Sequence, residues 1–147
     1  MRPLATALVL APLLAAVLSA ALPARAADLR FEVGKEGFAV PPASLSCVRW
    51  TYDRMRQVVV QVGLDRAAAA RLAGLTGKGI GRKMVIVVAG KPVFAATIRE
   101  RIADGRSQIA GSFTIGDAQT LVGHLGGTKG DCAAFPAPPP DPEKQPE

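Results

Sequence analysis

Two cysteines are the residues of this sequence best suited to covalent chemistry. Cys47 and Cys132 lie near the two ends of the region with regular hydrophobic patterning, and the chain has no other thiol. In an oxidising compartment an even, isolated pair of cysteines normally forms a disulfide. Redox-active pairs usually occur as C-x-x-C, so a bridge between such distant residues indicates a structural role. We therefore expect a Cys47–Cys132 disulfide that ties the ends of one domain together.

The other reactive side chains do not form a recognisable catalytic set. Nucleophilic catalysis by Ser or Cys requires a nearby base, and His124 is the only histidine. A metal site that used the two cysteines would need further ligands of this kind. Glu100 and Asp104 lie among arginines, and Asp117 occupies a helix-capping position. The sequence therefore predicts no enzymatic activity, no metal site and no cofactor.

Three arginines form the main candidate for a partner-binding site. Arg99, Arg101 and Arg106 lie between two predicted strands, and they are either a contact surface or an ordinary solvated loop face. A free sheet edge, or a groove beside the hairpin at Gly90, is a further candidate for the working surface. Extended peptides bind such edges by adding a strand. We therefore expect the protein to bind polypeptide at one of these surfaces.

The first 26 residues indicate export. Arg2 precedes an apolar run over residues 4–22, and Ala24-Arg25-Ala26 matches an A-x-A cleavage site. An uncleaved membrane anchor is the alternative, because a run of this length could nearly span a bilayer. The many alanines of the run and Pro12 favour cleavage. We expect a periplasmic protein that stays close to the membrane only if the signal is retained.

The charge of the mature chain argues against nucleic acid as a partner. Cleavage after Ala26 would remove two arginines and leave 16 basic against 12 acidic residues, a net charge of +4. Nucleic-acid-binding surfaces combine a basic stripe with stacking aromatics, but this chain has one Trp and one Tyr. The 121 residues that remain of the 147 are enough for one domain with a single core.

The hydrophobic periodicity predicts one domain between two looser ends. Residues 27–46 form an N-terminal extended segment, with a short strand at 29–33 and a surface crossing at 34–46. Residues 47–132 form the domain, and residues 133–147, with Pro at six of 15 positions, form a disordered tail. The domain is expected to contain strands at 47–52 and 57–62, a helix at 65–75, strands at 84–88, 93–98 and 107–113, and a helix that begins at Thr114.

Local signals define the helix starts and the central hairpin. Asp65 is a good N-cap, and Thr114 with Asp117 makes a start similar to a capping box. Gly90-Lys91 is expected to form a two-residue type II′ turn, because Gly tolerates positive φ. The predicted fold is α+β, with one antiparallel sheet and two helices on one face in ββαβββα order. The expected core is Val58, Val60, Leu72, Leu75, Val85, Val87, Ile98, Ile109, Phe113, Leu121 and Leu125.

Three segments resemble a known protein family. They are GRKMVIVVAG at 81–90, IRERI at 98–102 and QIAGSFT at 108–114. Their order and residue types are similar to those of the head of the first periplasmic domain of SecD, a subunit of the bacterial protein-export machinery. That family typically has GKRLAIVLDG, IREPI and QISGSFT at these places. The resemblance covers roughly residues 58–125, and it is that of a head without its membrane-spanning part.

The resemblance implies a role in handling exported polypeptide. In the SecD family the head is thought to hold emerging preprotein while membrane carboxylates, which have no counterpart here, use proton flow. This chain differs from the family at Arg101 (usually Pro), Ala89 (usually an acid) and Ala110 (usually Ser). The expected function is a non-enzymatic exported module that binds polypeptide or Sec translocon components and assists translocation or folding at the periplasmic side of the inner membrane. The alternative is a structural or regulatory envelope domain unrelated to export.

Overall fold

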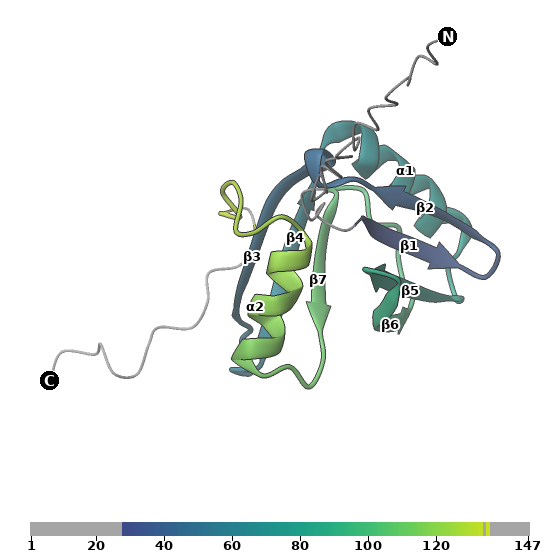
Figure 1. Cartoon of the computed structure of the whole chain (residues 1–147). Coiled ribbons are helices and arrows are strands. Elements are labelled where there is room, and N and C mark those ends of the chain that lie inside the picture. The colour runs from purple at the N-terminus through teal and green to yellow at the C-terminus, as the bar shows by residue number, and fades with distance from the viewer. Residues whose placement is uncertain (1–27, 134, 136–147) are drawn as a thin grey trace, which may run out of the picture.

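The computed structural model describes residues 28–133 and 135, which form two antiparallel sheets and two α-helices (Figure 1). The predicted signal peptide and most of the predicted tail lie outside the described residues. The α+β class is confirmed, and so is the ββαβββα order from β3 to α2. The elements are β1 (Leu29–Val33), β2 (Glu36–Val40), the short 3-10 helix η1 (Pro42–Ser44), β3 (Leu45–Tyr52), β4 (Val58–Leu64), α1 (Arg66–Lys78), β5 (Lys83–Val88), β6 (Lys91–Thr97), β7 (Arg106–Ala110) and α2 (Ile115–His124).

Two sheets replace the single sheet that the sequence predicted. The four-stranded sheet has the order β2-β1-β5-β6, and the three-stranded sheet has the order β3-β4-β7. Strand β1 pairs antiparallel with both β2 and β5, so the β5–β6 hairpin joins the N-terminal strands instead of β4 or β7. The expected surface crossing at 34–46 is wrong over residues 36–40, which form β2. Gly34, at φ 62°, turns the chain so that Phe38 lies opposite Phe31.

The four-stranded sheet buries one of its faces. On β5 the buried side chains are Met84, Ile86 and Val88, whereas Val85 and Val87 are half-buried on the other face. The prediction that Val85 and Val87 lie in the core is therefore wrong. Successive side chains of a strand point to opposite faces. Because β5 is apolar at both sets of positions, its hydrophobicity alone could not identify the buried face.

The rest of the predicted core is largely confirmed. Val58 and Phe113 are half-buried and pack against the core cluster. The buried members of the prediction are Val60, Leu72, Leu75, Ile98, Ile109, Leu121 and Leu125.

The helix starts follow their capping residues. The Asp65 side chain accepts a hydrogen bond from the Ala68 backbone N–H at 2.8 Å, and α1 continues to Lys78, beyond the predicted end. Thr114 and Asp117 form a complete capping box at the start of α2, as predicted. Helix α1 contacts β2 and β4, whereas α2 contacts β3 and β4. The helices therefore cover both sheets instead of one face of a single sheet (Figure 1). Neither described helix is long and apolar enough to cross a membrane.

The β5–β6 turn lies one residue earlier than predicted. Ala89 and Gly90 are its two central residues, with φ of 51° and 75°, and β6 begins at Lys91. Positive φ at both central positions is the mark of a type I′ turn, the mirror-image turn that matches the twist of a hairpin. The expected Gly90-Lys91 type II′ turn is therefore wrong. Ala rarely adopts positive φ, which is why the residue types favoured the later position.

Candidate functional site

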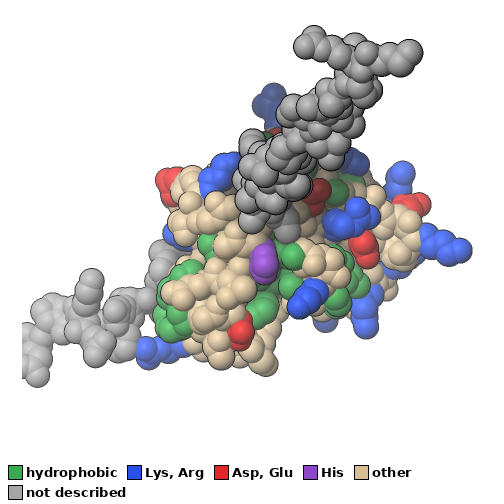
Figure 2. Space-filling model, in the orientation of Figure 1, with side chains coloured by type: hydrophobic (Ala, Val, Ile, Leu, Met, Phe, Trp, Pro, Cys, Tyr) green, Lys and Arg blue, Asp and Glu red, His purple; other side chains and the backbone are tan. Residues whose placement is uncertain are grey.

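A groove lies between the β5–β6 hairpin and α2. It has a volume of about 500 Å³. Figure 2 shows the face that carries it, where the histidine marks the groove and hydrophobic side chains lie on both sides. The α2 wall consists of residues at i, i+3, i+4 and i+7, which share one face of a helix. The lining residues are Val88, Ala89, Lys91 and Val93 from the hairpin, Phe113 from the preceding loop, and Asp117, Thr120, Leu121 and His124 from α2.

The groove has an apolar floor and a polar rim. Val88 and Leu121 are buried, and Val93 and Phe113 are half-buried. The rim is formed by exposed polar and charged side chains: Lys91, Asp117, Thr120 and His124. An apolar floor with a few polar groups around it is typical of a binding site for an apolar or extended ligand.

The rim carboxylate is engaged in holding α2. Asp117 accepts hydrogen bonds from the Thr114 backbone N–H at 2.9 Å and from the Thr114 hydroxyl at 2.7 Å. The backbone and side-chain bonds from Thr114 hold the pKa of Asp117 below its usual value. Because the ionised form is the one stabilised, Asp117 is suited to capping rather than to proton transfer.

Strand β6 borders the groove and is the outermost strand of its sheet. It pairs with β5 on one side, and among the described residues no strand pairs with its other side. An outer strand presents main-chain N–H and C=O groups that can pair with an added strand. Pro92 lacks an N–H, so the beginning of β6 offers one donor fewer than the remainder. A free sheet edge and a groove beside this hairpin are the two alternatives that the sequence predicts for the working surface.

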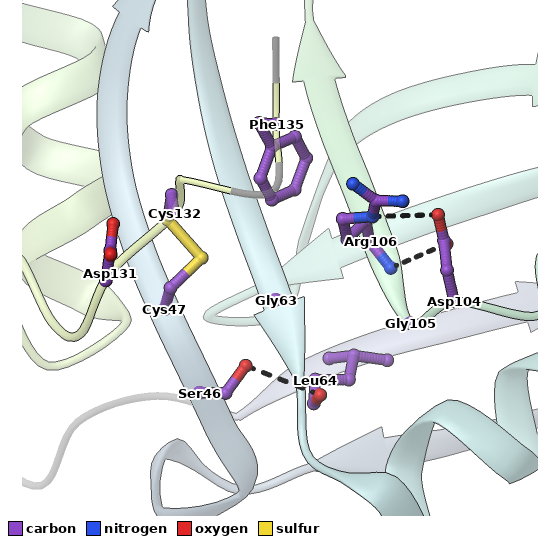
Figure 3. A pocket seen from close by; sticks show the side chains of 10 residues that line it. All are labelled: Ser46, Cys47, Gly63, Leu64, Asp104, Gly105, Arg106, Asp131, Cys132 and Phe135. Atoms are coloured by element: carbon purple, nitrogen blue, oxygen red, sulfur yellow. Dashed lines mark hydrogen bonds and ion pairs between the residues drawn. A yellow bond between two sulfur atoms is a disulfide. The ribbon is translucent and has the colours of Figure 1, made fainter. Parts of the chain in front are cut away.

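A second cavity, of about 300 Å³, lies beside the disulfide (Figure 3). Arg106 forms an ion pair with Asp104, at 2.8 Å from Nε to Oδ2, and its guanidinium lies 5.9 Å from the centre of the Phe135 ring. Partial burial raises the pKa of Asp104, but the Arg106 backbone and side-chain hydrogen bonds and its charge outweigh this and keep the pKa below its usual value. The pair is therefore ionised, and Phe135, from the predicted tail, closes one side of the cavity.

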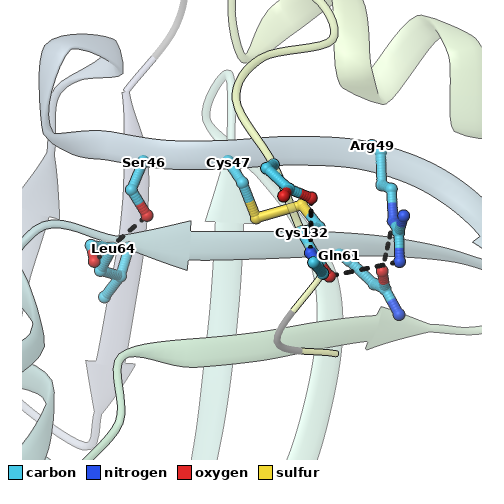
Figure 4. The surroundings of a disulfide bond; sticks show 8 residues. Ser46, Cys47, Arg49, Gln61, Leu64 and Cys132 are labelled. Atoms are coloured by element: carbon cyan, nitrogen blue, oxygen red, sulfur yellow. Dashed lines mark hydrogen bonds between the residues drawn. A yellow bond between two sulfur atoms is a disulfide. The ribbon is translucent and has the colours of Figure 1, made fainter. Parts of the chain in front are cut away.

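Cys47 and Cys132 are paired in the structure, with Cα atoms 5.5 Å apart (Figure 4). Both cysteines are buried. Arg49 donates from Nη2 to the Cys132 carbonyl at 3.3 Å and from Nε to the Gln61 side-chain oxygen at 2.7 Å. The bridge therefore fastens the C-terminal segment to β3 and, through Arg49, to β4.

The three arginines of the predicted partner-binding site have different surroundings. Arg99 is exposed on the link between β6 and β7. Arg101 turns back onto α1, where its Nε donates to the Ala73 carbonyl at 3.4 Å. Arg106 faces the cavity beside the disulfide. Partner binding by these residues stays a prediction. Among residues 28–133 and 135, no group of three His, Cys, Asp or Glu side chains could hold a metal ion.

Sequence reasoning found the position of the groove but not its second wall. The hairpin side was predicted, whereas Asp117 was considered only as a helix cap and Thr120 and His124 were not placed at this site. Their spacing with Leu121 was visible in the sequence and could have indicated one helix face. What it could not indicate is that this face lies beside Val88 and Val93.

The chain is thus a small α+β domain with a groove on its surface. The chain belongs to the family described as SecDF, P1 head subdomain, which residues 30–128 match. It is similar to the protein translocase subunit SecD of Dictyoglomus turgidum, with 33% identity over 95 residues, 65% of this chain and 23% of that protein. The SecD of Magnetococcus marinus is 33% identical over 88 residues, 60% of this chain and 16% of that protein. The chain thus spans less than a quarter of these relatives.

Solved structures share the fold. One, described as a membrane component SecDF that enhances protein export, superposes with a TM-score of 0.57 at 18% identity and covers 71% of this chain and 64% of that chain. Another, SecDF in a super-membrane-facing form, has a TM-score of 0.53 at 23% identity and covers 60% of this chain and 12% of that chain. The match of residues 30–128 to the family confirms the predicted resemblance.

Proposed function

We propose that this protein is a non-enzymatic exported domain that binds polypeptide and assists translocation or folding at the periplasmic side of the inner membrane. The observation that carries the proposal is the groove, whose apolar floor lies directly beside the free edge of β6. A site of this kind combines hydrophobic contacts with main-chain pairing, and neither depends on a particular ligand sequence. Such tolerance suits a module that handles many different exported chains.

The geometry suggests how an extended polypeptide would be held. Its backbone would pair with β6 beyond Pro92, and alternate side chains would point toward Val93, Phe113 and Leu121, since side chains of a strand alternate between faces. Thr120 and Lys91 at the rim would contact polar groups of the bound chain. The ligand class is therefore unfolded polypeptide with apolar side chains at alternate positions.

The family and the disulfide support the cellular setting. The matched relatives are translocase subunits, and a solved neighbour is described as enhancing protein export. Disulfides persist in oxidising compartments, which fits a buried Cys47–Cys132 bridge in the periplasm. We include Sec translocon components among the proposed partners for the same reason.

Photo-crosslinking at α2 would test this function. A photoreactive amino acid at Thr120 faces the groove, whereas one at the adjacent Gln119, which is also exposed, lies outside its lining and is the matched control. In cells that export a model preprotein, we expect Thr120 to crosslink to that preprotein and Gln119 to do so far less. Equal crosslinking from both positions, or none from Thr120 during active export, would contradict the proposal.

Co-purification from a detergent extract would show which proteins this domain binds in the cell. Recovery of translocon subunits is expected, and it should weaken when Thr120→Arg narrows the groove but persist with Gln119→Arg. A stable complex with one unrelated envelope protein, unaffected by either variant, would instead favour the structural or regulatory alternative.

A further inference from the structure

Large exposed hydrophobic side chains gather at one end of the three-stranded sheet. Four such residues are exposed among those described: Tyr52 at 40%, Met55 at 81%, Ile80 at 56% and Ile115 at 41%. Tyr52 pairs with Val58 at the end of the β3–β4 hairpin, and Val59 pairs with Ala110, the last residue of β7. The β3–β4 turn and the chain that leads from Ala110 into α2 therefore emerge at the same end of this sheet. Three of the four residues lie there.

We propose that this end binds the surface of an anionic phospholipid bilayer. We call it the sheet-end patch and define it as Tyr52, Arg54, Met55, Arg56 and Ile115. It is separate from the groove, because none of these residues lines the groove or the cavity beside the disulfide. The proposal goes beyond polypeptide binding, since it assigns a second ligand to a second surface.

The β3–β4 turn is fixed so that Met55 projects from it. The Asp53 side chain accepts hydrogen bonds from the backbone N–H groups of Met55, at 2.8 Å, and Gln57, at 2.9 Å. The Asp53 backbone N–H donates to the Gln57 carbonyl at 2.9 Å, and the Arg56 N–H donates to the Asp53 carbonyl at 3.0 Å. Arg56 completes the turn at φ 61°. An ordered turn exposes Met55 without the entropic cost of ordering it on binding.

The charges of the patch favour an anionic surface. Arg54 and Arg56 are exposed on either side of Met55. Asp53 and Asp117 also lie at this end, but their carboxylates accept hydrogen bonds from backbone N–H groups of their own turns. Basic side chains beside apolar and aromatic ones are typical of surfaces that contact anionic lipid, where cations meet the headgroups and aromatics lie at the interface. A projecting turn suits a bilayer, which needs no complementary cavity.

Vesicle binding by the processed protein, purified from the periplasm with its N-terminus established by mass spectrometry, would test the proposal. The probes are vesicles of phosphatidylcholine alone and of phosphatidylcholine mixed with phosphatidylglycerol. We expect sedimentation with the mixed vesicles only. Each of Arg54→Gln and Arg56→Asn should weaken the affinity roughly fivefold, the effect of about one cation at an anionic surface. Asn at position 56 tolerates positive φ, so this variant keeps the turn.

The only tryptophan of the chain reports on the same contact. The Trp50 ring makes an edge contact with Tyr52, with centroids 6.0 Å apart. Brominated lipids should therefore quench Trp50 fluorescence in the mixed vesicles, and Met55→Asp should remove the quenching. Ile80→Asp is the matched control, because Ile80 is an exposed hydrophobic residue with basic neighbours on the α1–β5 link, away from the patch.

The outcomes separate this proposal from its rivals and from the proposed function. Loss of vesicle binding with Met55→Asp but not with Ile80→Asp supports the sheet-end patch. Equal losses, binding without quenching of Trp50, equal binding to both kinds of vesicle, or binding of an acidic peptide but not of vesicles would each overturn it. Crosslinking from Thr120 is not affected by any of these results, so the groove is tested separately.

Discussion

The two sheets of this domain are stabilised in different ways. The four-stranded sheet buries one face, with Phe31 and Ile86 fully enclosed and the alternate residues of β5 partly exposed. The three-stranded sheet is covered on both faces, so that β4 is buried at every position from Val59 to Leu64. Helix α2 packs on one face, and the C-terminal strap, which we define as residues 129–133 with Phe135, lies across the other (Figures 1 and 4).

The strap shows what a covering segment without regular structure requires. The backbone of Lys129 in the strap pairs with that of Val48 in β3. Cys132 is bonded to Cys47, and the Arg49 side chain donates a hydrogen bond to the Cys132 carbonyl. Helix α2 covers the opposite face through apolar side chains that need no such bonds. A segment with few apolar contacts is therefore held by one covalent and several polar bonds, and the following predictions test that difference.

Removal of the disulfide should have the largest effect. Replacing Cys47 and Cys132 by Ala is expected to lower the free energy of unfolding by about 4–5 kcal/mol on the chain-entropy model, since the bridge spans 85 residues. Chemical denaturation would measure this loss. Amide hydrogen exchange should also show that Val48 and Lys129, which bond to each other at 2.8 and 2.9 Å, lose protection more than β5 does.

The state of the thiols provides the control for this experiment. In wild-type protein both cysteines should resist alkylation until they are reduced under denaturing conditions. Rapid labelling of native, unreduced protein would show that the bridge is absent in solution. A double variant as stable as the wild type would show that the strap does not depend on it.

Truncation of a side chain on the buried face of the four-stranded sheet is expected to cause the next largest loss of unfolding free energy. Ile86→Ala should cost about 2–5 kcal/mol, because it removes fully buried methyl groups and leaves a cavity. Val87→Ala, on the other face of the same strand, should cost roughly 1 kcal/mol, because Val87 is half-exposed. Paired urea titrations would compare them, and equal losses would show that both faces of β5 are buried in solution.

The error at β5 shows where sequence reasoning reached its limit. The helix caps at Asp65 and Thr114 depend on residues a few positions apart, and they were predicted correctly. The buried face of β5 depends on which elements cover it, and a strand that is apolar on both faces carries no local sign of that. The insertion of β1 between β2 and β5 is likewise a long-range pairing, which turn chemistry and periodicity do not encode.

The candidate site divides in the same way. The groove was expected beside the hairpin because the hairpin is local, and its α2 wall was missed because it comes from a distant segment. Phe135 was placed in a disordered tail on composition, since prolines surround it in the sequence. Its burial depends on the disulfide and on Arg106, which are contacts that composition does not reveal.

Loss of the hydrogen bond between Arg49 and Gln61, beneath the strap, should lower the free energy of unfolding by an intermediate amount. Gln61 is buried at 3% exposure, and Arg49 is the hydrogen-bond donor to its side-chain oxygen. Arg49→Met should cost about 1–3 kcal/mol, because a buried polar atom loses its partner. The double variant Arg49→Met/Gln61→Met should recover part of this loss. A double-mutant cycle with no coupling between the two positions would show that the bond does not contribute in solution.

A substitution in the β5–β6 turn should raise the free energy of unfolding, whereas those above lower it. Ala89 adopts φ of 51°, a region that costs an L-residue with a Cβ roughly 1–2 kcal/mol, whereas Asn is tolerated there. Ala89→Asn is therefore expected to raise the free energy of unfolding by about 0.5–1 kcal/mol. Ala89→Val should lower it, because β-branched residues are poorly suited to this conformation. Thermal melts would measure both, and stabilisation by Val would exclude the positive-φ turn.

The smallest expected effect is the pH dependence of the α2 cap. Asp117 has a pKa below its ordinary value of 3.8 because Thr114 donates two hydrogen bonds to the carboxylate. A carboxyl group whose pKa is lower in the folded state stabilises that state when ionised, so its contribution is complete well above pH 3.8. The contribution should disappear as the pH falls through 3.8 toward the folded-state pKa.

The difference in unfolding free energy between wild type and Asp117→Asn should therefore be constant near neutral pH and shrink in acid. Asp104, whose pKa is also lowered, is present in both proteins, so its effect cancels in this comparison. A difference that stayed constant throughout the acid range would show that the Thr114–Asp117 cap is not formed in solution.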